Sequence, residues 1–162
     1  MDFKKSTLVI ISLLFLSACA VKQYTAPNAG SVAEVLLIDS ASNEVAGHGA
    51  MFNFFENPIE CIGMYGAIPA GKKVNVEADK RFTTWVTRLS GVSLCEQAIS
   101  FLPEGGKLYK IVSTYNPHSD GKQCGLGVFV RTESEVWELE RTMKIRETTR
   151  PFLQSGSWCR AG

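Results

Sequence analysis

Short apolar stretches follow one another between residues 34 and 132, separated by residues that favour turns. Residues 73–77 alternate strictly between polar and apolar positions, which puts Val74 and Val76 on one face of a strand. Residues 82–89 are rich in the β-branched and aromatic side chains that fit a pleated sheet. The pattern predicts strands over residues 34–38, 51–55, 73–77, 82–89, 94–101, 108–115 and 125–132.

Residues 137–145 fit two patterns. A strand would place on one face Trp137, Leu139, Met143 and Ile145, and on the other Glu138, Glu140, Thr142 and Lys144. A helix would instead align Val136, Leu139 and Met143. We favour the strand, because its alternation is the longer of the two patterns.

Two similar turn sequences each precede a predicted strand. Residues 68–72 contain Pro69 and Gly71, and residues 102–107 contain Pro103 and Gly106. Proline fixes φ early in a turn, and glycine supplies the positive φ later. No other segment indicates a helix of ten or more residues. Closely spaced strands joined by such turns predict an all-β fold, an antiparallel β-sandwich.

The first residues of the chain have the order of an export signal. Lys4 and Lys5 supply positive charge, and residues 8–16 are apolar except for Ser12. This run is shorter than the roughly twenty apolar residues that cross a bilayer, so it predicts a removable signal. The sequence Leu16-Ser17-Ala18-Cys19, which ends it, resembles the lipobox of bacterial lipoproteins. The alternatives are an ordinary signal peptide that contains a cysteine and a short buried helix.

The lipobox resemblance implies a lipid anchor. The signal would be cut before Cys19, a diacylglyceryl group would be attached to the thiol, and the new amino group would be acylated. Two or three acyl chains, at about 0.8 kcal/mol per buried methylene, hold a protein on a membrane essentially permanently. In Gram-negative envelopes an aspartate after the cysteine retains a lipoprotein at the inner membrane. Ala20 at this position favours the outer membrane, facing the periplasm.

The turn-then-strand layout is similar to that of small transthyretin-like and immunoglobulin-like sandwiches of bacterial lipoproteins. This resemblance covers about half of the mature chain and is carried by turns, which fix no chemistry.

The expected organisation is a signal peptide over residues 1–18, the lipidated cysteine with a flexible tether over 19–32, and a β-sandwich domain over 33–162. Removing residues 1–18 leaves 144 of the 162 residues, which is enough for one domain. The seventeen basic and sixteen acidic residues become fifteen of each, because two lysines and one aspartate are removed. Without a basic excess, nucleic acid is not an expected partner.

Four cysteines remain beside Cys19, and an even number in an exported chain predicts two disulfides. They are Cys61, Cys95, Cys124 and Cys159. A zinc site would need close pairs or adjacent histidines, which these spacings lack, so we expect neither a metal nor another cofactor. Three connectivities are open. We favour Cys61 with Cys95 and Cys124 with Cys159, because each pair then brackets a separate block of strands.

Candidate catalytic residues are few. A hydrolase would combine a histidine with a serine and an aspartate, and the candidates are His48 or His118, Ser40 or Ser119, and Asp39 or Asp120. The chain has no G-x-S-x-G elbow to position such a serine. Both histidines lie in turn sequences, so we interpret them as solvated turn residues. No phosphate-binding loop occurs either, because neither proline–glycine turn has the required spacing.

Glu138 and Glu140 would suit a retaining glycosidase, whose two carboxyl groups lie about 5 Å apart. The cations nearby favour a salt-bridged surface strand instead, namely Arg131, Arg141, Lys144 and Arg146.

Six aromatic residues would serve either a ligand platform or the core: Trp85, Trp137, Trp158, Tyr65, Tyr109 and Tyr115. We favour the core. By analogy with immunoglobulin domains, Trp158 is expected to cover a disulfide beside Cys159.

Three functions remain open. The one we favour is a non-enzymatic, lipid-anchored binding or structural module of the cell envelope. The second is a periplasmic inhibitor or immunity lipoprotein that blocks a hydrolase or toxin. The third, an envelope hydrolase, has the least support. The expected partners are the membrane, through the lipid anchor, and an envelope protein.

Overall fold

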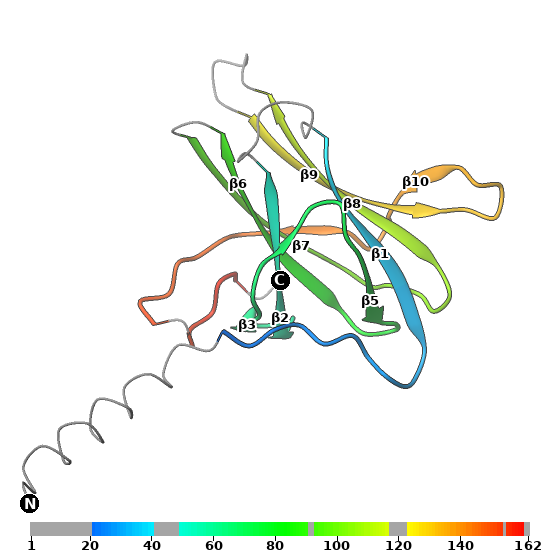
Figure 1. Cartoon of the computed structure of the whole chain (residues 1–162), viewed down its shortest axis with the longest axis horizontal. Helices are drawn as coiled ribbons and strands as arrows, with labels where there is room; N and C mark the ends of the chain where they lie inside the picture. Colours follow the sequence, from blue (N-terminus) through cyan, green and yellow to red (C-terminus); the bar gives the residue numbers. More distant parts are fainter. Residues whose placement is uncertain (1–20, 41–48, 91–92, 117–122, 154, 161–162) are drawn as a thin grey trace, which may run out of the picture.

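The computed structural model describes residues 21–40, 49–90, 93–116, 123–153 and 155–160, and these form an all-β sandwich. Two sheets pack face to face, as Figure 1 shows. The signal peptide and Cys19 lie outside the described residues, and so do His48, His118, Ser119 and Asp120. The predicted fold class is confirmed.

The first sheet has five strands in the order β10 (Trp137–Leu139), β9 (Gln123–Arg131), β8 (Leu108–Asn116), β1 (Val32–Asp39) and β5 (Lys73–Glu77). The second contains β11 (Lys144–Arg146), β7 (Ser93–Phe101), β6 (Phe82–Ser90), β2 (Ala50–Asn57) and β3 (Ile62–Met64), with β4 (Ile68–Pro69) also paired to β2. The ladders are antiparallel except that β1 runs parallel to β8. The seven strands predicted between residues 34 and 132 are confirmed, whereas the two- and three-residue strands β4 and β3 were not predicted.

The core lies between the sheets and is rich in aromatic side chains. On β1, Ala33, Val35 and Leu37 point inward and are fully buried. Edge-to-face contacts connect the rings of the second sheet, with Phe82 centred 4.8 Å from Phe54 and 5.6 Å from Phe101. Each fully buried side chain of this size contributes about 1.5–3 kcal/mol. The core therefore supplies most of the attraction between the two sheets.

The two proline–glycine turns hold β1, which lies between β8 and β5, at both ends. Gly71 and Gly106 have φ of 85° and 74°, in the region that glycine adopts without strain. The Gly71 N–H donates to the carbonyl of Leu37 at 2.7 Å, and the Gly106 N–H donates to that of Val32 at 2.8 Å. These turns therefore start β5 and β8 on either side of β1, as predicted.

The prediction of one strand over residues 137–145 is wrong. Residues 137–139 pair with β9 in the first sheet, and residues 144–146 pair with β7 in the second. The chain between them turns and crosses the edge of the sandwich. Leu139 and Ile145, expected to share a buried face, are both more than half exposed. The alternation misleads because each short strand follows a different sheet edge.

The favoured disulfide pairing is also wrong. Cys61 is bonded to Cys159, and Cys95 is bonded to Cys124. The second bond joins β7 to β9 and so connects the two sheets. The first fixes the end of the chain against the loop after β2. Our pairing assumed separate blocks of strands, whereas the topology brings together cysteines from different blocks.

A buried ion pair connects the sheets near the end of β1. The guanidinium of Arg88, on β6, bonds to one carboxylate oxygen of Asp39. The other oxygen accepts the Ala50 N–H at 2.9 Å, and the Arg88 guanidinium lies 5.5 Å from the centre of the Tyr115 ring. Removing one member of such a pair leaves a buried charge and costs about 3–5 kcal/mol. Asp39 therefore helps to connect the two sheets, and its surroundings are not those of a catalytic acid.

Residues 21–31, expected to belong to a flexible tether, lie against the sandwich, and Val32 already belongs to β1. We call this segment the N-terminal clasp. The Tyr24 hydroxyl donates to the carbonyl of Asn75 at 2.7 Å, and its ring centre lies 4.8 Å from that of Phe54. Burial raises the pKa of Tyr24 to about 12, so the hydroxyl remains a donor even at alkaline pH. The Gly66 N–H donates to the carbonyl of Lys22 at 2.8 Å.

We predict that Tyr24→Ala releases the clasp and that Tyr24→Phe does not. Alanine loses the ring contacts as well as the hydrogen bond, whereas phenylalanine loses only the bond, worth about 1 kcal/mol. Hydrogen exchange at the Gly66 amide measures this directly, because that amide donates to the clasp. Exchange should accelerate strongly in the alanine variant only. Equal protection in both variants would show that Tyr24 does not hold the segment.

Candidate functional site

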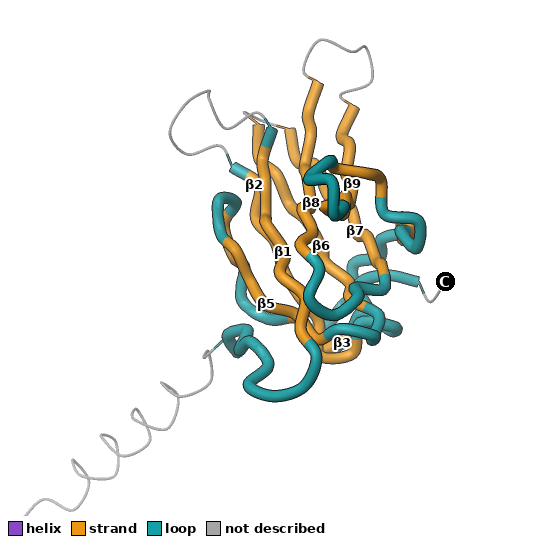
Figure 2. Tube along the Cα trace, turned by 90° about the vertical axis from the view of Figure 1, so that its right-hand side faces the viewer, coloured by secondary structure: helices purple, strands orange, loops and turns teal. Residues whose placement is uncertain are grey.

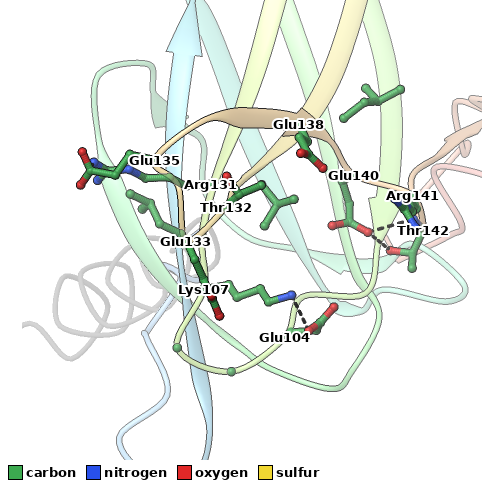
Figure 3. A pocket seen from close by; sticks show the side chains of 15 residues that line it. Glu104, Lys107, Arg131, Thr132, Glu133, Glu135, Glu138, Glu140, Arg141 and Thr142 are labelled. Atoms are coloured by element: carbon green, nitrogen blue, oxygen red, sulfur yellow. Dashed lines mark hydrogen bonds and ion pairs between the residues drawn. The ribbon is translucent and has the colours of Figure 1, made fainter.

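An open groove of about 920 Å³ lies beside β10. One side is the chain from Thr132 to Thr142, which we call the groove arm, and the other is the turn from Glu104 to Lys107 that precedes β8. Figure 3 shows charged side chains from both sides around this groove. Five carboxylates and three cationic side chains line it.

The groove arm is fixed to the sandwich at its C-terminal end by a chain of hydrogen bonds. The Leu102 N–H donates to Thr142 Oγ1 at 2.8 Å, and Thr142 Oγ1 donates to Glu140 Oε1 at 2.8 Å. The same carboxylate oxygen accepts the Thr142 N–H, also at 2.8 Å. Glu140 is only 8% exposed, and its N–H donates to the carbonyl of Val128 on β9. Glu140 therefore shapes the turn between β10 and β11.

The other end of the groove arm is a tight turn. The Thr132 N–H donates to the carbonyl of Val136 at 2.9 Å, and the Glu135 N–H donates to that of Thr132 at 2.9 Å. Glu135 has a φ of 63°, which is costly for a residue with a side chain and is held here by the turn. The arm is thus bonded at both ends, so the outline of the groove is preorganised.

Two ion pairs occupy the groove walls. Lys107 lies 2.6 Å from Glu104, and this hydrogen bond raises the lysine pKa. Arg131 lies 2.8 Å from Glu135. Among the described residues, Glu133 and Glu138 have no ion-pair partner. Carboxylates are therefore in excess, and the groove favours basic ligands over acidic ones.

A buried hydroxyl bonds the 104–107 turn to the sandwich. The Glu104 N–H donates to Tyr109 Oη at 2.9 Å, and the Tyr109 side chain is fully buried between the sheets. Burial is the main reason why the pKa of Tyr109 is raised, and the nearby Glu140 carboxylate raises it further. Tyr109 therefore remains neutral and holds the turn in place.

The serine and aspartate proposed for a hydrolase do not form a catalytic arrangement where the structure describes them. Asp39 is committed to Arg88, as described above. Ser40 Oγ donates to the carbonyl of Ser113 at 3.1 Å, so its hydroxyl proton is engaged by the backbone. The other residues of that hypothesis lie outside the described ranges.

The expectation of a salt-bridged surface strand around Glu138 and Glu140 is wrong in two respects. Glu140 is buried and bonded to Thr142, and Arg131 pairs with Glu135 instead. Arg146 is buried as well, where its guanidinium donates to the carbonyls of Ile59 at 2.9 Å and Arg160 at 2.6 Å. Burial lowers the pKa of Arg146 from its ordinary value. The alternation of polar and apolar residues could not show that the side chains of Glu140 and Arg146 are buried.

The aromatic candidates divide between the core and the surface. Trp85 and Tyr109 are buried, which confirms the core interpretation for these two. Trp158 packs edge-on against Trp85, with ring centres 5.4 Å apart, in the cluster that contains Cys61 and Cys159. Trp158 therefore packs against the cluster that holds the Cys61–Cys159 bond, and its role as a cover for that bond stays a prediction. Trp137 is half-buried, and the Lys110 ammonium lies 4.5 Å from its ring centre.

In the part of the chain that the structure describes, no three metal-ligating side chains come together. The four cysteines of the domain are consumed in disulfides and offer no thiolate to zinc. No helix within the described ranges has the length and apolar character needed to cross a bilayer.

Comparison with protein-family models, with curated proteins and with solved structures finds no match for this chain.

Sequence reasoning missed the groove itself. Its walls come from residues 104–108 and 130–142, which only the pairing of β8, β9 and β10 brings together. A usable signal was present, since Arg141 interrupts the apolar face of the alternation where the chain turns.

We predict that Thr142→Val loosens the groove arm, whereas Thr142→Ser preserves it. Valine keeps the shape but cannot accept from Leu102 or donate to Glu140, and each lost hydrogen bond costs about 1 kcal/mol. The free energy of unfolding in urea should fall by about 2 kcal/mol for valine and much less for serine. Hydrogen exchange at the Leu102 amide should rise in the valine variant alone. Equal stability of both variants would contradict this role of the hydroxyl.

Proposed function

We propose that this protein is a lipid-anchored lipoprotein of the bacterial cell envelope and that its β-sandwich acts by binding. The observation that carries the proposal is the order of charged segment, apolar segment and Leu16-Ser17-Ala18-Cys19. The enzymes that lipidate and cleave bacterial lipoproteins require a thiol, small residues before it and a large apolar residue. Cys19, the two residues before it and Leu16 meet these requirements. Ala20 supports an outer-membrane location on the periplasmic side.

Two features of the domain support binding over catalysis. The groove beside β10 has fixed walls and an excess of carboxylates, which suits recognition of a basic segment on an envelope protein. The Glu140 side chain is buried and one of its carboxylate oxygens holds a turn, whereas a general acid or base must reach the substrate to exchange a proton. Anchoring would also raise the concentration of the domain near partners on the same membrane.

We predict that Cys19→Ser abolishes lipid attachment, because serine lacks the thiol that carries the diacylglyceryl group. Cells given radiolabelled palmitate should incorporate it into the wild-type protein and not into the variant. Ser17→Ala is the matched control, since it keeps a small residue in the cleavage box and should still be labelled. Palmitate on the Cys19→Ser protein, with retention in the membrane fraction, would overturn the lipoprotein proposal.

A further inference from the structure

The end of the sandwich that carries the N-terminal clasp also presents exposed apolar side chains. Phe152 is fully exposed, Leu153 is 65% exposed and Ile59 is 55% exposed. Val21, at the start of the clasp, is 60% exposed. We call these four residues the apolar end. In Figures 1 and 2, the clasp and β3 lie at the bottom of the molecule, away from the upper ends of β8 and β9.

Hydrogen bonds and a disulfide connect the parts of this end. Lys22 pairs with Glu56 near the end of β2, so Val21 is held beside that strand. The Asn57 side chain accepts the Ile59 N–H at 3.2 Å, which fixes the turn that presents Ile59. The Trp158 N–H donates to the carbonyl of Cys61 at 3.0 Å, next to the Cys61–Cys159 bond. The turn after β2 and the last residues of the chain are therefore one connected surface.

Phe152 and Leu153 belong to a braced loop and not to a free tail. Thr149 donates its N–H to the carbonyl of Trp158 at 2.9 Å and its hydroxyl to that of Ser157 at 2.8 Å. The Gly156 N–H donates to the carbonyl of Leu153 at 2.9 Å, and Arg150 lies 2.7 Å from Glu96 on β7. A loop bonded on both sides holds Phe152 in water in the described structure. Two adjacent apolar side chains held in water in this way are available for contact with an apolar surface.

The lipid anchor would bring this end to the membrane. Cys19 precedes Lys22 by three residues, and three residues span at most about 11 Å. Because Lys22 is bonded to Glu56 and Gly66, an acylated Cys19 cannot lie far from the apolar end. The clasp thus removes most of the freedom that a tether of about a dozen residues would give the domain.

The charges at this end do not call for an anionic partner. Three exposed cations near the apolar residues are paired with carboxylates: Lys22 with Glu56, Arg150 with Glu96 and Arg160 with Glu147. Arg146, which donates to the carbonyl of Ile59, is buried and does not face the solvent. A contact based on attraction to anionic lipid would need unpaired cations. The exposed groups through which this end can contact a membrane are therefore apolar side chains. Such side chains bind at the boundary between lipid headgroups and acyl chains.

We propose that the apolar end rests on the bilayer and that Phe152 and Leu153 insert into its interface as a second contact beside the acylated Cys19. This inference rests on the proposed lipid anchor. It assigns an orientation to the domain, with the ends of β8 and β9 and the Cys95–Cys124 bond directed away from the membrane. Contact through apolar side chains should form on zwitterionic lipid and persist at high salt.

We predict that a polarity-sensitive fluorophore at residue 152 is buried in lipid. Full-length acylated protein carrying Phe152→Cys is labelled and reconstituted into phosphatidylcholine vesicles that contain a spin-labelled lipid. Its emission should shift to the blue and be quenched by the spin label, at both low and high salt. The matched control is Leu94→Cys. Leu94 is also half-exposed, but it lies at the start of β7, where it pairs with Leu89 and not with the apolar end. A label at that position should stay unquenched.

Two failures are distinguishable in the same sample. Protein whose mass shows no acyl chains and which does not bind the vesicles would refute the anchor. Acylated, vesicle-bound protein with an unquenched label at residue 152 would refute the membrane contact and leave the anchor standing.

Discussion

The Cys61–Cys159 bond is the constraint on which the outer surface of the second sheet depends. It joins residues 98 positions apart, and a loop of this length makes a disulfide worth about 4.7 kcal/mol. The bond also brings Trp158 onto Trp85 and lets Arg146 donate to the carbonyls of Ile59 and Arg160. Without it, hydrogen bonds such as that from the Trp158 N–H to the carbonyl of Cys61 would be left to hold the last residues in place.

The two ends of the sandwich are stabilised differently. Near the end of β1, the Asp39–Arg88 pair and the Cys95–Cys124 bond connect the sheets directly. At the other end, the clasp inserts Tyr24 against Phe54 and the terminal residues cover Trp85. Rigid connections at one end and attached chain segments at the other give the domain two distinct faces. Such a division suits a protein held at a membrane by one end.

The sequence predicted the strands well and their partners poorly. Alternation identified β5 and the turn glycines identified the starts of β5 and β8, because both signals are local. The disulfide pairing failed because which cysteines meet depends on the order of strands in each sheet. The prediction of one strand over residues 137–145 failed because the chain there pairs first with the edge of one sheet and then with the edge of the other. The groove and the clasp likewise depend on contacts between distant residues, as the Tyr24 bond to Asn75 shows.

We propose above all that an acyl anchor and a docked clasp keep this domain directly on the bilayer. Neutron reflectometry of the full-length acylated protein on a supported phosphatidylcholine bilayer measures the gap between headgroups and protein. The account predicts a protein layer that begins at the headgroups without an intervening water layer. A fully extended segment over residues 20–31 would allow a gap of about 40 Å. A water layer approaching that thickness, or no retained protein layer, would contradict the account.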